Sequence, residues 1–302
     1  MSRTPATLDR RAVELALLAP RGEFARVEMV EEISSTNAQL AADAASDPAQ
    51  WPEPSVLIAN SQFAGKGRLD RSWNVPAGAA LISSVFLRPD PATFDVTGYG
   101  WLSIAAGVAL CQAVQGETGV QARLKWPNDV VVGGRKLAGI LAQVVAPIAA
   151  ADGGTRGPGV VVGAGVNISQ QRAELPVERA TSLALELGLA AESAPDRSVL
   201  LPAYLNRFAR LYRDFARAGG DATRPLGDGA SLQRLASELM TTLGTDVRAE
   251  LPGGQMLHGN ATGLGPHGEL EIRDADGVLH TVTAGDVVHL RRVGDSGEAG
   301  YA

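Results

Sequence analysis

The chain has 302 residues, of which 45% are hydrophobic, which is enough for one large domain with a buried core and one small domain. Its 27 basic and 33 acidic residues give a net charge of −6, and this acidic balance argues against nucleic acid as the main partner. A single cysteine excludes an intrachain disulfide, and no apolar run reaches the ~20 residues of a membrane span. We therefore expect a cytoplasmic protein without a membrane segment.

The first predicted element is a short amphipathic helix near the N-terminus, whose charges are mixed into its apolar residues, unlike those of a secretory signal. A second helix follows in "ISSTNAQLAADAA", where Thr36 and Gln39 fit a capping box. Residues 55–60 and 79–89 are predicted to be buried strands. Residues 101–119 are predicted to form a helix with a glycine-rich end, in which Cys111 is expected to be a buried, inert thiol.

A hairpin is predicted within residues 123–146, because two apolar runs flank Gly133-Gly134. Trp126 precedes a proline and is expected to be extended. In the second strand of this hairpin one face would carry four residues, with small alanines leaving room for a ligand beside the lysine: Lys136, Ala138, Ile140 and Ala142. A further strand at 158–169 and an amphipathic helix at 198–220 complete the large domain.

From about Leu243 the pattern changes to short strands separated by turns at Pro252–Gly254, Gly265-Pro266 and Asp276-Gly277, which predicts a small β barrel. We expect a catalytic domain at 1–240, the β domain at 241–292 and a flexible tail at 293–302. All four histidines lie after residue 257, and we expect those in the barrel at exposed strand positions. A Ser-His-Asp triad, a Cys-His pair or a histidine-rich zinc site in the main body is therefore excluded.

The stretch "SQFAGKGRLDRSWNVPAGAAL" places Lys66, Arg68 and Arg71 among glycines. Backbone amides of such a loop can surround an anion, and the cations add charge. The alternative is a mobile surface turn with solvated cations. Neither a Walker A motif nor a dinucleotide fingerprint fits, because no Ser or Thr follows Lys66 and "GAGVNI" lacks its third glycine.

Four motifs in order, "SSTN", "QFAGKGRLDRSW", "LKWPNDVVVGGRKLAGIL" and "GAGVN", resemble biotin protein ligase over about Ser34–Ser169. The C-terminal segment is similar to the family's SH3-like domain. The resemblance implies an α/β fold with a mixed sheet and flanking helices, like the class II aminoacyl-tRNA synthetases, plus a small SH3-like β barrel. Two residues depart from the family loop G-R-G-R-x-G-R-x-W: Lys66 replaces an arginine and Asp70 a glycine. Both bear on adenylate affinity and on ordering of the loop.

The family makes biotinyl-5′-AMP from biotin and ATP with Mg²⁺, and then transfers biotin to a lysine of a biotin carboxyl carrier protein. By resemblance, Lys136 contacts the biotin carboxylate and the α-phosphate, and Arg68 belongs to a loop that closes over the ligand. The other implied biotin contacts are Ser35, Thr36, Asn37, Gln62, Lys66 and Gly67. The other implied ATP or adenylate contacts are Gly65, Arg71, Trp73, Asn128 and Asn167, and Asp129 is placed near Mg²⁺.

Three alternatives stay open. A lipoate or octanoate ligase or transferase shares the fold, although the intact "KWPND" and "RKLAGIL" blocks favour biotin. A biotin-responsive DNA-binding repressor would need a winged helix, and only 34 residues precede Ser35, so a monofunctional enzyme without DNA binding is expected. The third is a catalytically inactive scaffold whose β barrel binds partners. Neither the carrier nor the oligomeric state follows from the sequence.

Overall fold

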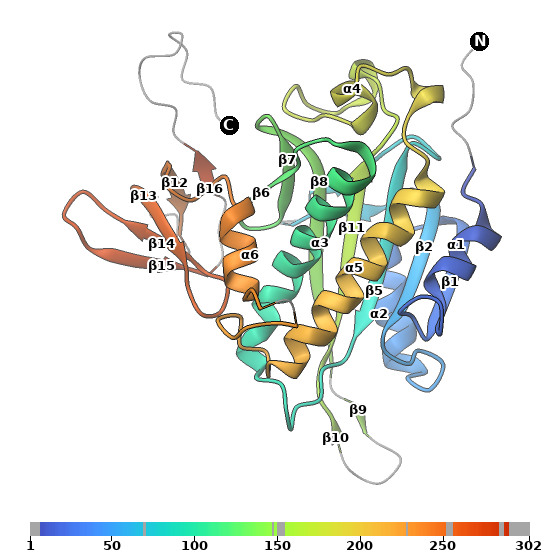
Figure 1. Ribbon diagram of the computed structural model, residues 1–302, viewed down its shortest axis with the longest axis horizontal. Helices are drawn as coiled ribbons and strands as arrows, with labels where there is room; N and C mark the ends of the chain where they lie inside the picture. The colour runs from blue at the N-terminus through green and yellow to red at the C-terminus, as the bar shows by residue number, and fades with distance from the viewer. Residues whose placement is uncertain are drawn as a thin grey trace.

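A computed structural model describes residues 7–68, 71–146, 148–149, 155–227, 229–251, 256–283 and 287–289. Its centre is a seven-stranded mixed sheet (Figure 1). In spatial order the strands are β1 (Arg26–Ile33), β2 (Ser55–Gln62), β5 (Ala80–Leu87), β11 (Gly159–Asn167), β8 (Arg135–Val145), β7 (Asp129–Val132) and β6 (Arg123–Lys125). Only β1 and β2 pair in parallel among these strands. The predicted mixed α/β class is confirmed.

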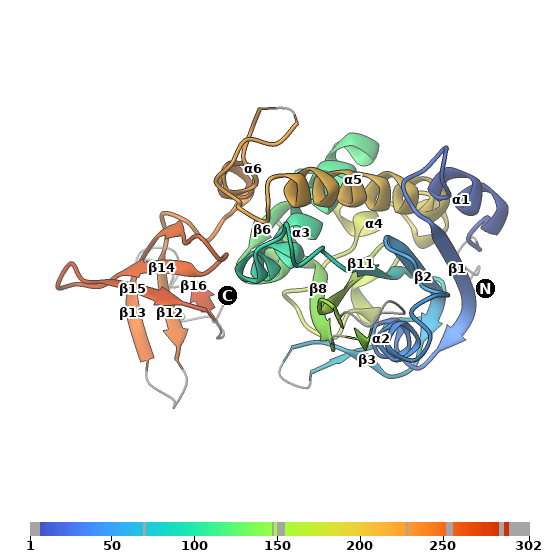
Figure 2. The same ribbon diagram turned by 90° about the horizontal axis from the view of Figure 1, so that it is seen from below.

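Helices cover both faces of this sheet. The helices α3 (Trp101–Thr118) and α5 (Arg197–Arg217) lie on one face, with α1 (Arg10–Leu17) packed against α5, and α2 (Thr36–Ser46) lies on the other (Figures 1 and 2). The predicted helices near the N-terminus and at 101–119 and 198–220 therefore form. A helix packed on only one side would show a polar face, whereas α3 is apolar around most of its circumference from Trp101 to Cys111, because it lies between the sheet and α5.

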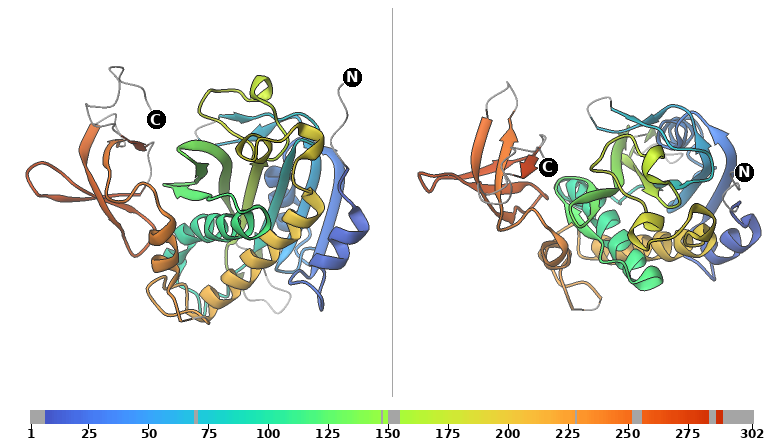
Figure 3. Two further views of the ribbon diagram at one scale, coloured as in Figure 1. Left: turned by 45° about the horizontal axis from the view of Figure 1, so that its top comes forward. Right: turned by 90° about the horizontal axis from the view of Figure 1, so that it is seen from above.

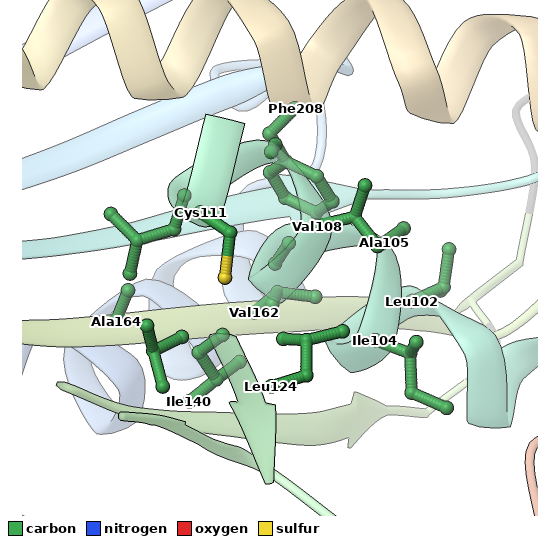
Figure 4. Packing of buried hydrophobic residues seen from close by; sticks show 14 of the residues in the cluster. Leu102, Ile104, Ala105, Val108, Cys111, Leu124, Ile140, Val162, Ala164 and Phe208 are labelled. Carbon is green, nitrogen blue, oxygen red and sulfur yellow. The ribbon is translucent and has the colours of Figure 1, made fainter. Parts of the chain in front are cut away.

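Within α3, Cys111 and Val108 pack with Ile140 and Ala164 of the sheet and with Phe208 of α5 (Figure 4). On length and composition Val96–Thr118 could cross a membrane, which the sequence analysis did not anticipate. Since 67% of its apolar window is buried inside the protein, this segment is explained as the core helix.

The alternation of residues along β11 creates a hollow on the α2 face. Val162 and Ala164 point into the core beneath α3 (Figure 4), whereas Gly163, Gly165 and Asn167 alternate with them on the opposite face. A Cβ at Gly163 would lie 2.0 Å from Asn37 Oδ1, and one at Gly165 would lie 2.6 Å from the Trp73 ring. In the "GAGVN" motif, Gly163 and Gly165 therefore place no side chain on the α2 face of β11, and Asn167 is the next residue on that face.

The β7–β8 hairpin forms as predicted, with Gly133 and Gly134 at φ 54° and 79°. However, the register shifts between Val130 and Val131, so a bulge lies next to Lys136. The expected phase of Lys136 with Ala138 and Ile140 is therefore wrong: these two belong to the core beneath α3. The residue that makes room for the lysine is Gly139, whose added Cβ would lie 3.4 Å from Lys136 Nζ.

One local prediction also needs correction. The N-cap of α2 is Ser35, whose side chain accepts a hydrogen bond from the Ala38 amide, so the predicted capping box at Thr36 is one residue out of position. Trp126 lies in a turn, with a cis peptide bond to Pro127. The smaller elements are β3 (Gly65–Lys66), β4 (Ser72–Trp73), η1 (Val96–Gly100), β9 (Ile148–Ala149), β10 (Thr155–Arg156), η2 (Arg172–Glu174), α4 (Leu183–Glu186) and η3 (Ala191–Ser193).

Beyond α6 (Leu232–Leu239) the chain forms a five-stranded antiparallel sheet that stands beside α3 (Figures 2 and 3). Its strands, in spatial order, are β15 (Leu279–Val282), β14 (Leu270–Arg273), β13 (Met256–Leu264), β12 (Asp246–Glu250) and β16 (Val287–His289). The turn between β13 and β14 is held by two indoles of the large domain: Trp101 Nε1 donates to Pro266 O at 2.8 Å, and Trp126 Nε1 donates to Gly268 O at 2.9 Å.

The turns predicted around Gly265-Pro266 and Asp276-Gly277 form, with Gly268 and Gly277 at φ 85° and 81°. The histidines only partly follow the expectation. His258 is exposed on β13, but His267 lies in a turn and His280 is half-buried with its Nε2 2.6 Å from Asp274 Oδ2. The predicted turn at Pro252–Gly254 and the tail at 293–302 lie outside the described residues.

Candidate active site

A cavity of about 620 Å³ opens on the α2 face of the sheet, where the glycines of β8 and β11 leave space. This volume suits a small-molecule ligand. Every residue that the sequence analysis assigned to the site, except Gly65, contributes to its wall: Ser35, Thr36, Asn37, Gln62, Lys66, Gly67, Arg68, Arg71, Trp73, Asn128, Asp129, Lys136 and Asn167. The tertiary structure thus brings four separated motifs to one place, while their individual roles stay predictions.

The cavity is cationic although the chain is acidic. Among the described lining residues six carry positive charge, namely Lys66, Arg68, Arg71, Lys125, Lys136 and Arg179, whereas Asp129 and Glu174 are the two carboxylates. Charge of one sign in a concave, partly dry site raises the local concentration of the opposite ion. The arrangement therefore selects an anionic ligand.

Lys136 is held at the start of β8 from two sides. Its amide donates to Arg179 O at 2.6 Å, and its carbonyl accepts from the Thr181 amide at 2.8 Å. Its Nζ lies 2.6 Å from Asp129 Oδ1 and 5.7 Å from the centre of the Trp73 ring. The ammonium group is thereby oriented in the cavity, half-exposed and beside one carboxylate.

The glycine-rich loop is a closed hairpin. Strand β3 pairs with β4, and Gly67 donates its amide to Arg71 O at 2.6 Å. This amide is therefore used within the loop in this conformation, and the predicted contact of the loop with an anion stays a prediction. Gly65 is needed for close approach, since a Cβ there would lie 2.3 Å from Trp73 O. Asp70, the departure from the family pattern, lies outside the described residues.

One end of the cavity is neutral and hydrogen-bonding. Ser84 Oγ of β5 lies 2.8 Å from Thr36 Oγ1 and 2.6 Å from Asn37 Oδ1. Because each hydroxyl has a single proton, Ser84 donates to Asn37 and Thr36 donates to Ser84. Asn37 Nδ2 donates to Leu141 O at 2.9 Å, and the Thr36 amide lies 3.5 Å from Gln62 Oε1. These bonds leave one Asn37 N–H and a Thr36 oxygen lone pair for a ligand.

Two side-chain amides near Lys136 donate hydrogen bonds to backbone carbonyls. Asn128 Nδ2 donates to Ile140 O at 2.8 Å, and Asn167 Nδ2 donates to Thr181 O at 2.9 Å. Gln170, which the motifs did not indicate, donates its Nε2 to Asn167 Oδ1 at 2.9 Å. Two polar atoms of this region are buried without a hydrogen-bond partner, Trp73 Nε1 and Gln170 Oε1. Such orphaned atoms are costly, and a bound ligand can satisfy them.

Sequence reasoning missed several lining residues. Lys125 and Arg179 add positive charge, and Leu175, Pro176 and Val177 add an apolar wall. Lys125 stands within the "LKWPND" motif and could have been found there; the segment 170–180 carries no motif. Among the described residues no group of three or more His, Cys, Asp or Glu side chains could hold a metal by itself.

The chain matches two protein families. The Biotin/lipoate A/B protein ligase family covers residues 29–167, and the Biotin protein ligase C terminal domain covers residues 242–290. It is 39% identical over 295 residues to the biotin--[acetyl-CoA-carboxylase] ligase of Mycobacterium tuberculosis, covering 94% of this chain and 96% of that protein. It is 29% identical over 254 residues to the bifunctional ligase/repressor BirA of Bacillus spizizenii, covering 84% and 71%.

The fold has close neighbours among solved structures. The biotin protein ligase from Aquifex aeolicus in complex with biotin and ATP superposes with a TM-score of 0.65 at 24% identity, covering 89% of this chain and 100% of that one. At this identity the likeness concerns the fold.

Proposed function

The chain belongs to the biotin protein ligase family, and we propose that it activates biotin with ATP and then transfers the biotinyl group to a lysine of a carrier protein. In the first step a biotin carboxylate oxygen forms a bond to the α-phosphorus, and the bond to the pyrophosphate leaving group breaks. In the second step the carrier amine forms an amide with the biotinyl carbonyl carbon, AMP leaves and the amine loses a proton.

The observation that carries this proposal is the combination, in one cavity, of a cationic middle and a neutral polar end. The first step brings a carboxylate and a triphosphate together, so positive charge must offset their repulsion. Lys136 with Arg68, Arg71 and Lys125 provides that charge. We assign Lys136 to the biotin carboxylate and the α-phosphate, because its ammonium group is oriented by Asp129 and the Trp73 ring.

The neutral end favours biotin over lipoate. The ureido ring of biotin carries one carbonyl and two N–H groups, which match the remaining N–H of Asn37 and the oxygen of Thr36. The dithiolane ring of lipoate has no such groups and would leave these polar atoms unsatisfied. We therefore expect biotin, but not lipoate, to raise the melting temperature of the protein.

The hairpin Gly65–Trp73 is the element we propose to close over the adenylate. A mixed anhydride is hydrolysed by water, so the site must exclude solvent between the two steps. The loop contributes Lys66, Arg68 and Arg71 to the cavity wall, and its strands β3 and β4 bring it over Gly165 through Trp73. Closure would place these charges against the phosphate.

One carboxylate of the cavity wall, Asp129, is suited to hold Mg²⁺ together with the phosphates of a bound nucleotide. Magnesium in nucleotide enzymes is commonly held by one or two carboxylates together with substrate phosphates. Asp129 is the lining carboxylate beside Lys136, and it would share its charge between that ammonium group and the ion. The ion, when bound, would neutralise phosphate charge.

Mass spectrometry of a biotin carboxyl carrier domain incubated with the protein, biotin and Mg-ATP tests the proposal. A mass gain of one biotinyl group on the domain, together with biotin-dependent exchange of pyrophosphate into ATP, supports it. Absence of both activities, with folded protein and carrier, would identify a binding protein or scaffold instead.

A further inference from the structure

The backbone of Lys136 is held by a segment outside the sequence motifs, residues 179–181. The pairing of β8 with β11 reaches only as far as Ala138, so Lys136 lies two residues beyond it. There the Lys136 amide donates to Arg179 O at 2.6 Å, and the Lys136 carbonyl accepts from the Thr181 amide at 2.8 Å. On the other side of β8 the register with β7 shifts next to the lysine. The place of Lys136 therefore depends on what holds this segment.

Glu186, the last residue of α4, holds the segment and the start of β8 together. Its Oε1 accepts hydrogen bonds from Thr181 Oγ1 and from Arg135 Nε, the latter at 3.1 Å. Arg135 Nη2 lies 2.9 Å from each of the two carboxylate oxygens. Arg135 directly precedes Lys136 in the chain, and the Thr181 amide bonds the Lys136 carbonyl. One carboxylate thus contacts both neighbours of the lysine.

The carboxylate of Glu186 is itself placed by a buried element. Leu183 and Ala184 of α4 are fully buried, and the Ala184 amide donates to Ile168 O, one residue after β11, at 2.8 Å. α4 lies at the end of the sheet where the β7–β8 hairpin turns (Figure 1). The side chain of Glu186 is 9% exposed, against 48% for Arg135. Burying a carboxylate is costly unless hydrogen bonds offset the cost, and here these bonds lead to the neighbours of the lysine.

Glu186 lies outside the cavity. Neither it nor Arg135 nor Thr181 contributes to the cavity wall, whereas Lys136 and Asp129 do. An effect of Glu186 on a reaction in this cavity must therefore pass through Lys136. The two carboxylates have different tasks: Asp129 orients the ammonium group at 2.6 Å, and Glu186 fixes the backbone from which that side chain extends.

We infer that Glu186 is a positioning residue for the activation step, because through Arg135 and Thr181 it fixes the point from which Lys136 reaches the carboxylate of the acid and the α-phosphate. The inference rests on the proposed function, since it needs Lys136 to act on those two groups. Misplacement of a catalytic group by about 1 Å can cost on the order of 10²-fold in rate. A glutamate that only stabilises the fold would leave this rate unchanged.

A double-mutant cycle on the formation of biotinyl-AMP tests the inference. In single-turnover assays Glu186→Ala should lower the rate of adenylate formation by about 10–100-fold. In the Lys136→Met background the same substitution should change the rate by less than about twofold, because the lysine through which it acts is gone. Glu186→Gln keeps one oxygen that accepts from Thr181 and Arg135, so it should recover part of the rate.

Glu23→Ala is the matched control. Glu23 is also shielded, with 18% of its side chain exposed, and its two oxygens pair with Arg210 at 3.3 Å and Arg213 at 2.5 Å. It lies outside the cavity wall and far from Lys136 in the chain. Loss of this carboxylate should lower stability, as loss of Glu186 does, while adenylate formation keeps its wild-type rate.

A normal rate in folded Glu186→Ala would overturn the inference. Rate losses that multiply in the double variant would also overturn it, since they would reveal an effect that does not pass through Lys136. Should Glu186→Ala fail to fold, Arg135→Met breaks the same ion pair from its exposed side and takes its place in the cycle, with the same outcomes for and against. Absence of biotinyl-AMP with wild-type protein refutes the proposed function itself, and this inference with it.

Discussion

Lys136 is the residue on which the proposed chemistry depends most directly. Its ammonium group is oriented by Asp129 at 2.6 Å and has space because residue 139 is glycine. We expect Lys136→Met to slow pyrophosphate release by about 10²–10³-fold, since the variant keeps the aliphatic stem but removes a charge positioned for the transition state. Single-turnover assays measure this rate. Near-normal release in a folded variant would exclude the lysine from the activation step.

Arg68 tests the retention of the intermediate, separately from its formation. It lies in the hairpin that contributes three cations to the cavity wall. Losing a charge-assisted contact to the adenylate should accelerate its release by about 10–100-fold in Arg68→Gly, and biotin should then appear on lysines of unrelated proteins. Arg21→Gly, at an exposed turn outside the cavity, is the control. Equal release rates in the two variants would contradict the role assigned to the loop.

Gly163 defines the size of the neutral end. A Cβ at this position would lie 2.0 Å from Asn37 Oδ1, so Gly163→Ala must displace the asparagine that we assign to biotin. We expect the Kd for biotin in calorimetry to rise about tenfold or more. Gly116→Ala, a helical glycine on α3 outside the cavity, should bind biotin normally and gain up to about 1 kcal/mol of stability. Unchanged affinity in Gly163→Ala would remove Asn37 from the biotin site.

At the scale of elements, burial within α3 changes the pKa of the Cys111 thiol. Cys111 is 1% exposed among apolar side chains of the sheet and α5, and this desolvation raises the pKa of its thiol to about 12. The thiolate is the reactive form, so its population at pH 8 is negligible. Iodoacetamide should leave native protein unmodified and label Cys111 once the chain unfolds. Labelling at the rate of a free thiol in the native state would show that α3 opens locally.

Most elements were predictable because their causes are local. The apolar runs at 55–62, 80–87 and 101–118, the helical periodicity of 197–217 and the paired glycines at 133–134 act within a few residues. The bulge beside Lys136 was not predictable, since it is a property of the pairing between β7 and β8. For the same reason the sequence predicted small alanines beside Lys136, whereas in the structure the residue beside it is Gly139.

The candidate site also has residues that were predictable from the sequence and residues that were not. Its motif residues were found because each motif is contiguous, although their convergence required the fold. Arg179, Leu175 and Gln170 join the cavity only because residues 170–182 fold back onto β8 and β11, through bonds such as Lys136 N to Arg179 O. No local pattern marks such a segment. Ser84 is similar: it is one of two adjacent serines in an otherwise apolar strand, and its role becomes visible only when β5 is placed beneath α2.

At the scale of the whole molecule, the C-terminal sheet is part of one continuous core. Val247, Ala261 and Ile272 belong to the same buried cluster as Trp101 and Leu124 of the large domain. The two indole hydrogen bonds to the β13–β14 turn add a polar connection. Because neither part can lose the other without exposing apolar surface, we expect a single calorimetric unfolding transition.

The same junction reaches the cavity, because Trp126 is followed by Asn128 and Asp129 in its wall. Trp126→Phe removes the N–H bound to Gly268 O and should lower stability by about 1 kcal/mol and also slow pyrophosphate exchange. Trp51→Phe, in a separate buried cluster beneath α2, should affect stability alone. Two well-separated transitions in wild-type protein, or normal exchange in Trp126→Phe, would show instead that the C-terminal sheet is an independent unit without influence on the site.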